Sequence, residues 1–137
     1  MPTRRAADRL DKLSRNLTKG VELLAFTITE NIGEVLVPAT PVDTGFARGN
    51  WRPSLNAPAT TPITFNDPTG EATIGKIKIV AKRFRIGDTI FIRNNAEYIS
   101  ALNLGSSPQA AAGFVKASVN EGFDNGIAEL ARRGGLL

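Results

Sequence analysis

The stretch PVDTGFARGNW, residues 41–51, separates this sequence into two halves. It contains the only tryptophan, Trp51, and the rigid Pro41. A long helical pattern ends just before this stretch, and a proline-rich segment follows it. We therefore predict that it forms a corner between two differently built parts of the chain.

The residue types in this stretch favour a tight turn. An aspartate followed two residues later by a glycine is typical of an Asx turn, in which Asp43 accepts backbone N–H bonds and Gly45 takes a positive φ. Arg48 is then placed to pair with Asp43. Trp51 is interpreted as a packing anchor, because platforms that stack nucleic-acid bases need several aromatic residues at groove spacing.

Before the corner, apolar residues recur at steps of three or four over residues 4–36, which predicts an amphipathic helix within residues 1–38. These apolar residues are Leu10, Leu13, Leu17, Val21, Leu24, Ile28, Ile32 and Val35. Thr3 can cap the start of the helix. Pro38 and Pro41 are expected to end it, because proline lacks an N–H and clashes with the preceding turn.

An unbroken helix of this length would be about 50 Å long. A domain of this size has a radius of gyration of about 14 Å, so the helix would project beyond its own domain. The apolar repeat continues into the projecting part, which favours oligomerisation. A kinked helix that folds back on itself is the alternative.

After the corner, residues 52–70 hold four prolines and are predicted to form an extended arm or loop. Alternating apolar residues over 71–93 predict a β-hairpin, with a bulge at Gly75 and a return strand at 89–93. Its polar face would carry Lys76, Lys78 and Lys82, which could face DNA or an acidic partner.

Two further helices are predicted at residues 96–104 and 110–132. Asn94 or Asn95 would cap the first helix, and Gly105 would end it in the left-handed conformation. Gly122 and Gly126 in the second helix would permit close packing against another helix. The tail, residues 134–137, is expected to be loose or to dock on a neighbour.

The whole chain, residues 1–137, is thus predicted to be one α+β domain. Its long N-terminal helix accompanies a small antiparallel β-sheet with a hairpin, and a short helix and a C-terminal helix pack on that sheet. At 137 residues such a domain can bury a core without covalent cross-links.

Composition narrows the function classes. The chain has no Cys and no His, which excludes disulfides and thiol chemistry and removes the commonest general base. We therefore predict no enzyme activity, no metal and no cofactor. The net charge of +4 comes from 17 basic and 13 acidic residues and is compatible with DNA or an acidic protein as a neighbour.

No stretch has the apolar length that a membrane span needs, and the N-terminal residues do not form a secretory signal pattern. We therefore expect a protein that folds in a cytosol, without a membrane partner.

The sequence leaves two alternative functions open. Asp43-Thr44-Gly45 has the triplet of aspartic proteases, but that chemistry needs two aspartates that share a proton. The basic residues of the predicted hairpin suggest a small nucleic-acid-binding module instead, although no recognised nucleic-acid-binding motif is present.

Two segments together resemble a known family. The first segment contributes Pro41, Asp43, Thr44, Gly45, Arg48 and Trp51, and the second contributes Asn95, Tyr98, Gly105, Gln109 and Phe114. In this order they are similar to the tail-component or neck proteins of tailed bacteriophages, the tail-completion or head–tail joining group. Ile99, Asn103 and Ala111 depart from the residues that are common in that family.

This resemblance implies a structural virion protein in the phage neck, assembled in the host cytoplasm. It would form a ring, most commonly a hexamer, between the head connector or stopper and the tail tube. The ring would surround the DNA channel, so that contact with DNA would be non-specific. The residues of the two segments named above would serve assembly and the structural turn.

Overall fold

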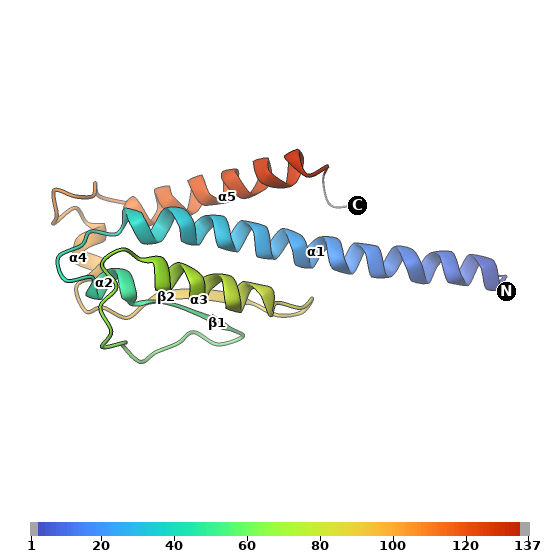
Figure 1. The fold of residues 1–137 in the computed structure, drawn as a ribbon, viewed down its shortest axis with the longest axis horizontal. Helices are drawn as coiled ribbons and strands as arrows, with labels where there is room; N and C mark the ends of the chain where they lie inside the picture. Colours follow the sequence, from blue (N-terminus) through green and yellow to red (C-terminus); the bar gives the residue numbers. More distant parts are fainter. Residues whose placement is uncertain (1–2, 135–137) are drawn as a thin grey trace.

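The computed structural model describes residues 3–134 of the chain, so residues 1–2 of the predicted first helix and residues 135–137 of the predicted tail lie outside the described part. Its elements are α1 (Arg4–Ala39), α2 (Phe46–Gly49), β1 (Trp51–Leu55), α3 (Glu71–Lys82), β2 (Ile90–Asn94), α4 (Ile99–Asn103) and α5 (Phe114–Arg132) (Figure 1). The architecture is α+β and rich in helix, as the sequence predicts.

Helix α1 is a continuous helix of 36 residues. The predicted cap is confirmed, because the Ala6 N–H donates to Thr3 Oγ1 at 3.2 Å. The helix runs through Pro38 and ends at Ala39, so the expected stop at Pro38 is one residue too early. At 1.5 Å per residue α1 is about 54 Å long, and its N-terminal part projects well beyond the rest of the molecule (Figure 1). The alternative of a helix folded back on itself is therefore wrong.

Helix α5 lies along the C-terminal half of α1, with α3 on another side of α1 (Figure 1). The predicted close approach at two glycines is confirmed. A Cβ added at Gly122 would lie 2.4 Å from Ile32 Cα, and one added at Gly126 would lie 2.9 Å from Ile28 Cα. Any side chain at these positions would push the two helix backbones apart.

The predicted hairpin over residues 71–93 is wrong in its first half, because residues 71–82 form helix α3. Thr73, Ile77 and Ala81 are buried at helical spacing, whereas Ile79 is exposed. A strand would place Ile79 on the same face as these three residues, so its exposure fits the helical period and not the strand period of two. Gly75 lies inside this helix and forms no bulge.

The sheet instead consists of β1 and β2, which pair antiparallel with Trp51 opposite Asn94 and Leu55 opposite Ile90. The predicted return strand is thus present, but its partner comes from the segment predicted as an arm. Pro53 is compatible with this strand because β1 has one strand neighbour among the described residues, which leaves an edge where no N–H is needed.

The other predicted boundaries are close to the observed ones. The short helix predicted at 96–104 is α4, which covers Ile99–Asn103, and the last helix begins at Phe114 rather than at residue 110. The core lies where the C-terminal half of α1 meets α3, the sheet and the start of α5. It is built from Leu36, Val37, Trp51, Ile77 and Phe114.

Candidate assembly site

Trp51 ties the corner to the end of α1. The indole is 6 % exposed, and its Nε1–H donates to Thr40 Oγ1 at 2.8 Å. The Thr40 hydroxyl in turn donates to the Leu36 carbonyl at 2.8 Å. This chain of hydrogen bonds satisfies the buried indole N–H, so the predicted role of Trp51 as a packing anchor is confirmed.

Arg48 stabilises the corner, although not through the predicted ion pair. Its guanidinium donates to the carbonyls of Pro38, Thr40 and Pro68 at 2.9, 3.0 and 2.6 Å. Asp43 is exposed, and within residues 3–134 its carboxylate takes part in no hydrogen bond or ion pair. The pairing prediction is wrong because the carbonyls at the end of α1 already occupy the arginine.

The turn itself is made by Thr44 and Gly45. The Phe46 N–H donates to Thr44 Oγ1 at 3.3 Å. The Thr44 hydroxyl therefore accepts the kind of backbone N–H bond that was predicted for Asp43. Gly45 has φ +91°, as predicted, and a Cβ there would lie 2.4 Å from the backbone nitrogen of Pro68. The Asp67 N–H donates to the Gly45 carbonyl at 2.9 Å. Residues 56–66 are called the arm from here on. The corner therefore packs directly on the residues that join the arm to α3.

Asn50 holds the middle of the arm, and the sequence did not single it out. Its side chain is fully buried, and its Nδ2 donates to the carbonyls of Phe46 and Ile63 at 2.8 and 3.0 Å. Its Oδ1 accepts from the Ile63 N–H at 2.8 Å. The signal that could have pointed to Asn50 is its position directly before Trp51, the first residue of β1.

Asp67 fixes the start of α3. Its buried carboxylate accepts the Thr73 N–H at 2.9 Å and the Thr73 hydroxyl at 2.7 Å, and also the Gly70 N–H at 3.2 Å. Carboxylates near a helix N-terminus are stabilised by its free N–H groups. The arm from 56 to 66 is therefore bound at its middle by Asn50, and Asp67 anchors the chain where the arm meets α3.

The structure brings the segment that contains Pro41 and Trp51 into contact with the segment that contains Tyr98 and Gln109. The Gln109 amide bonds Val42 twice: Oε1 accepts the Val42 N–H and Nε2 donates to the Val42 carbonyl, both at 2.9 Å. The Tyr98 ring lies 6.2 Å from the Phe46 ring, centroid to centroid. Gln109 lies 67 positions after Val42 in the sequence, so their spacing alone could not predict this pair.

The remaining residues of the second segment also have structural roles. Asn95 Nδ2 donates to the Ala59 carbonyl at 2.9 Å, which holds the arm rather than capping a helix. Gly105 has φ +93° directly after α4, as predicted. Phe114 is buried in the core. Pro41 is buried as well.

The three lysines predicted to share one face do not do so, because they lie on α3. Lys78 pairs with Glu34 at 2.9 Å, and the Lys82 ammonium lies 5.9 Å from the centre of the Phe26 ring, both on the α1 side. Lys76 lies 5.5 Å from the centre of the Phe65 ring, on the arm side. On a helix, positions two apart point in nearly opposite directions, so no single basic stripe exists there.

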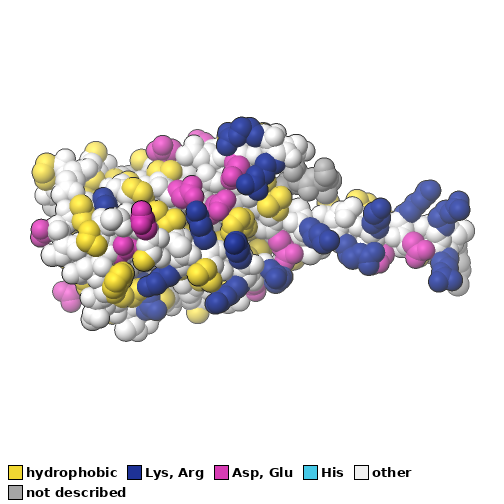
Figure 2. Space-filling model, in the orientation of Figure 1, with side chains coloured by type: hydrophobic (Ala, Val, Ile, Leu, Met, Phe, Trp, Pro, Cys, Tyr) yellow, Lys and Arg dark blue, Asp and Glu magenta, His cyan; other side chains and the backbone are white. Residues whose placement is uncertain are grey.

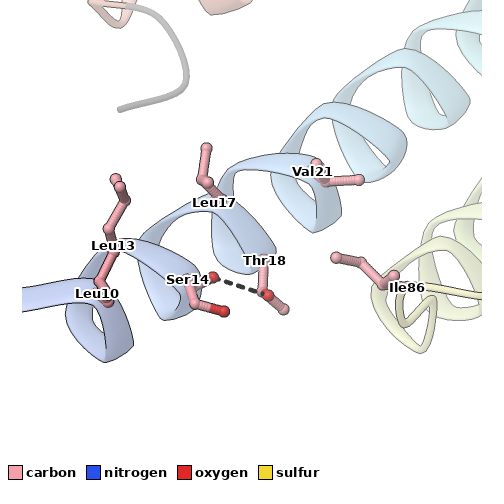
Figure 3. Close-up of a pocket in the computed structure, with 7 residues that line it drawn as sticks. All are labelled: Leu10, Leu13, Ser14, Leu17, Thr18, Val21 and Ile86. Atoms are coloured by element: carbon pink, nitrogen blue, oxygen red, sulfur yellow. Dashed lines mark hydrogen bonds between the residues drawn. The ribbon is translucent and has the colours of Figure 1, made fainter. Parts of the chain in front are cut away.

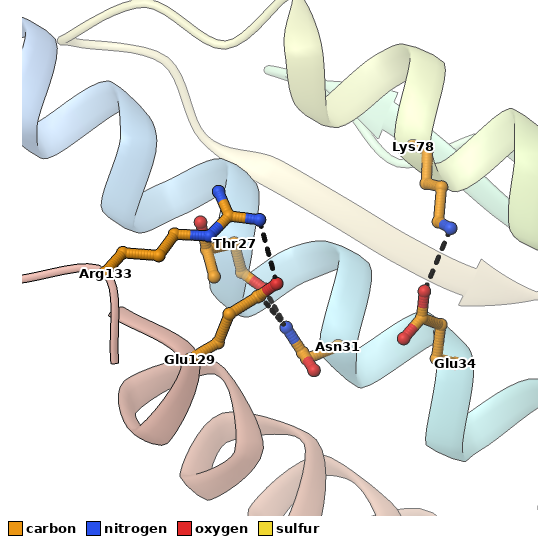
Figure 4. Close-up of polar contacts among 6 residues, drawn as sticks. All are labelled: Thr27, Asn31, Glu34, Lys78, Glu129 and Arg133. Carbon is orange, nitrogen blue, oxygen red and sulfur yellow. Dashed lines mark hydrogen bonds and ion pairs between the residues drawn. The ribbon is translucent and has the colours of Figure 1, made fainter. Parts of the chain in front are cut away.

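Polar contacts join α1 to α5 and α3 on one side of the molecule (Figure 4). Asn31 Nδ2 donates to Glu129 at 2.9 Å, and Glu129 pairs with Arg133 at 3.0 Å. Partial burial, helped by the nearby Glu129 and Glu34 carboxylates, raises the pKa of Glu30 above its ordinary value. The ionised form of Glu30 is therefore disfavoured in the fold.

Glu30→Gln is expected to raise the melting temperature slightly at pH 7. A carboxyl whose pKa is raised on folding contributes stability only below its unfolded pKa, and this is lost as pH rises through the folded value. The neutral amide avoids that loss, so the advantage of the variant should vanish near pH 4. Thermal unfolding of both proteins at pH 4 and pH 7 checks this. An equal shift at both pH values would contradict the electrostatic cause.

The projecting part of α1 exposes a row of apolar side chains, here called the stripe: Leu10, Leu13, Leu17 and Val21. Their exposed fractions are 63, 50, 46 and 41 %. Ile86, from the loop before β2, faces the Val21 end of this row (Figure 3). Large apolar side chains in such a continuous row are typical of a protein interface.

The other side of the projecting helix is basic. Lys and Arg side chains gather along it (Figure 2). They are Arg4, Arg5, Arg9, Lys12, Arg15 and Lys19, accompanied by Asp8 and Asp11. Arg15 pairs with Asp11 at 2.9 Å on the surface. The helix is thus amphipathic, and within residues 3–134 Ile86 at the Val21 end is what lies against its apolar side.

Within the described residues, no group of three or more Asp and Glu side chains is arranged to hold a metal ion. None of the described helices combines the length and apolar character needed to cross a membrane. Comparison with protein-family models, with curated proteins and with solved structures found no match.

Proposed function

We propose that this protein is a structural component of a tailed-bacteriophage virion. It forms a hexameric ring in the neck, completes the end of the tail and joins it to the head connector around the DNA channel. Its neighbours in the particle are connector or stopper proteins on one side and tail-tube proteins on the other. It is assembled in the host cytoplasm and acts through surface complementarity, without catalysis.

The observation that carries the proposal is the exposed stripe on the projecting part of α1. Full burial of one leucine side chain contributes about 1.5–3 kcal/mol. Three leucines that are half exposed therefore offer several kcal/mol to an association, which a monomer leaves unused. A permanent assembly would bury this apolar surface.

The packing of the corner supports the same proposal. Gln109, Tyr98 and Phe114 of the second segment lie against or beside the first segment. Residues that resemble the neck family are thus used together to build one rigid end of the molecule. A ring subunit needs such an end, because its position must be fixed relative to the projecting helix.

A nucleic-acid-binding module is the alternative from the sequence. The feature that favoured it was one basic face made by Lys76, Lys78 and Lys82, and those side chains point to different sides of α3. Lys78 is also paired with Glu34. The alternative therefore loses its main argument, and we do not propose it.

The proposal is tested by the mass and shape of the purified protein. We expect ring-shaped particles in electron micrographs and a mass that is a multiple of 14.6 kDa in sedimentation. The variant Leu13→Gln/Leu17→Gln should dissociate, because it removes apolar contact area without changing charge. Lys12→Gln/Lys19→Gln, with two substitutions on the opposite side, should remain assembled.

The helical content of both variants should stay the same, because all four side chains are exposed in the monomer. A protein that remains monomeric at every concentration, with no ring in any particle, would refute the proposed function.

A further inference from the structure

An apolar trough runs beside β2, on the side of the molecule where β2 and α5 face each other. Two adjoining hollows form it, and they share Trp51, Ile92 and Val115. Ile32, Ile90 and Val119 extend the apolar lining toward the projecting helix. Of the described residues that line the two hollows, Arg93 is the single charged one.

The stripe has the form that such a trough accommodates. At 100° per residue, Leu10, Leu13, Leu17 and Val21 fall within an arc of about 80° on the helix surface. The six basic residues of the same segment lie mostly on the opposite side. An amphipathic helix that enters an apolar groove buries one face and leaves its charged face in water. The stripe can thus be buried without desolvating the arginines and lysines.

A chain cannot place its stripe in its own trough. α1 is one straight helix whose C-terminal half, through Ile32, forms part of the trough lining. Its N-terminal part therefore points away from the trough of the same copy (Figure 1). Only a second molecule can bring the two surfaces together.

The number of contacts that each copy makes distinguishes two ways of joining copies. The projecting segment is about 24 Å long and roughly 10 Å wide, so one contact through the stripe buries only a few hundred Å² on each partner. A stable interface buries about 800 Å² per partner, and a symmetric stripe-to-stripe pair gives each copy one such small contact. In a head-to-tail arrangement each copy makes two contacts, its stripe in one neighbour and its trough against another, and a closing rotation produces a ring.

We propose that the stripe of one copy lies in the trough of the next copy, with the basic side of the helix toward solvent. This contact rests on the proposed ring and specifies which two surfaces build it. Leu10, Leu13 and Leu17 enter the trough, and Ile92, Val115 and Val119 receive them.

Engineered cysteines test the contact directly, because the chain has none of its own. We would prepare Leu13→Cys and Val119→Cys as separate proteins, mix them and treat the mixture with bis-maleimidoethane. This cross-linker spans a longer gap than a disulfide and so tolerates a small difference in register. The mixture should give a covalent dimer in several-fold higher yield than either variant alone.

The matched control replaces Leu13→Cys by Lys12→Cys, which places the thiol one residue away on the opposite side of the helix. Its yield with Val119→Cys should be several-fold lower. The double variant Leu13→Cys/Val119→Cys should give a ladder of covalent oligomers rather than dimers alone. That ladder is the signature of a head-to-tail contact.

Sedimentation of the same samples separates the two proposals. An oligomer in which Leu13→Cys links best to itself, or in which the mixture gives no more dimer than the control, overturns trough docking and leaves the ring proposal standing. A monomer at all concentrations overturns both. An oligomer with the expected cross-link supports both.

Discussion

Gly122→Ala is expected to destabilise the protein by roughly 3 kcal/mol, although the same change usually stabilises a helix. The new Cβ would lie 2.4 Å from Ile32 Cα, 2.8 Å from Ile32 N and 2.9 Å from the Asn31 carbonyl oxygen. All three atoms belong to the backbone of α1 and cannot rotate away as a side chain can. The helices must separate, which also weakens the hydrogen bond between Asn31 and Glu129.

Gly75→Ala provides the matched control for this effect. Gly75 lies in the interior of helix α3, and a Cβ added there would meet nothing within 4 Å. This variant should gain up to about 1 kcal/mol from helix propensity alone. Thermal unfolding at one fixed protein concentration compares the two variants, since assembly makes the melting temperature depend on concentration. A melting temperature for Gly122→Ala at or above that of the wild type would show that α1 and α5 are not in backbone contact.

The sequence predicted best where a single local pattern extends over many residues. The apolar repeat from Leu10 to Val35 predicted α1 and its projection, because the repeat continues without a change of period, and the alternative of a kinked helix is wrong. The glycines at 122 and 126 predicted the close packing of α5, since they recur one turn apart on the side of the helix that is buried.

The interpretation of residues 71–82 failed because two periods overlap there. Ile77 and Ile79 alternate as in a strand, while Thr73, Ile77 and Ala81 follow the helical period. The deciding signals lie at the start of the segment: Asp67 comes shortly before it and Glu71 is its first residue, and acidic side chains suit the N-terminus of a helix. Alternation over so few residues was weaker evidence than these two carboxylates.

Strand β1 was missed for a different reason. Its sequence, WRPSL, contains a proline and has no alternation of its own. What makes it a strand is its pairing with β2, about forty residues later, with Pro53 opposite Ile92. Such a pairing depends on tertiary packing, which local propensity does not report.

The candidate site was predictable residue by residue but not as an arrangement. Gly45, Gly105 and Trp51 have the conformations or burial that their types suggest. The contact between Gln109 and Val42 depends on how α4 and the following loop return to the corner. The exposed stripe, by contrast, followed from the sequence directly, because helix length and domain size together require it to project.

Asn50→Ala is expected to release the arm from the corner and to destabilise the protein by roughly 2–4 kcal/mol. The substitution leaves the N–H and carbonyl of Ile63 and the carbonyl of Phe46 without the side-chain partners they have in the fold. Each half-buried polar group left unpaired costs about 1–3 kcal/mol, and water entering the vacated space reduces that cost. The arm from 56 to 66 has no regular secondary structure, so little else would hold its middle in place.

Limited proteolysis separates release of the arm from general unfolding. In Asn50→Ala, cleavage within residues 57–66 should appear at temperatures where circular dichroism still reports native helix content. Asn66→Ala, at an exposed position in the same segment, should cleave and melt like the wild type. Cleavage spread evenly over the chain would mean that Asn50 supports the whole fold rather than the arm. The outcome also bears on assembly, because the arm packs against α2 and the strand that begins with Trp51, and Trp51 lines the trough. A released arm should therefore weaken oligomerisation even though no residue of the stripe has changed.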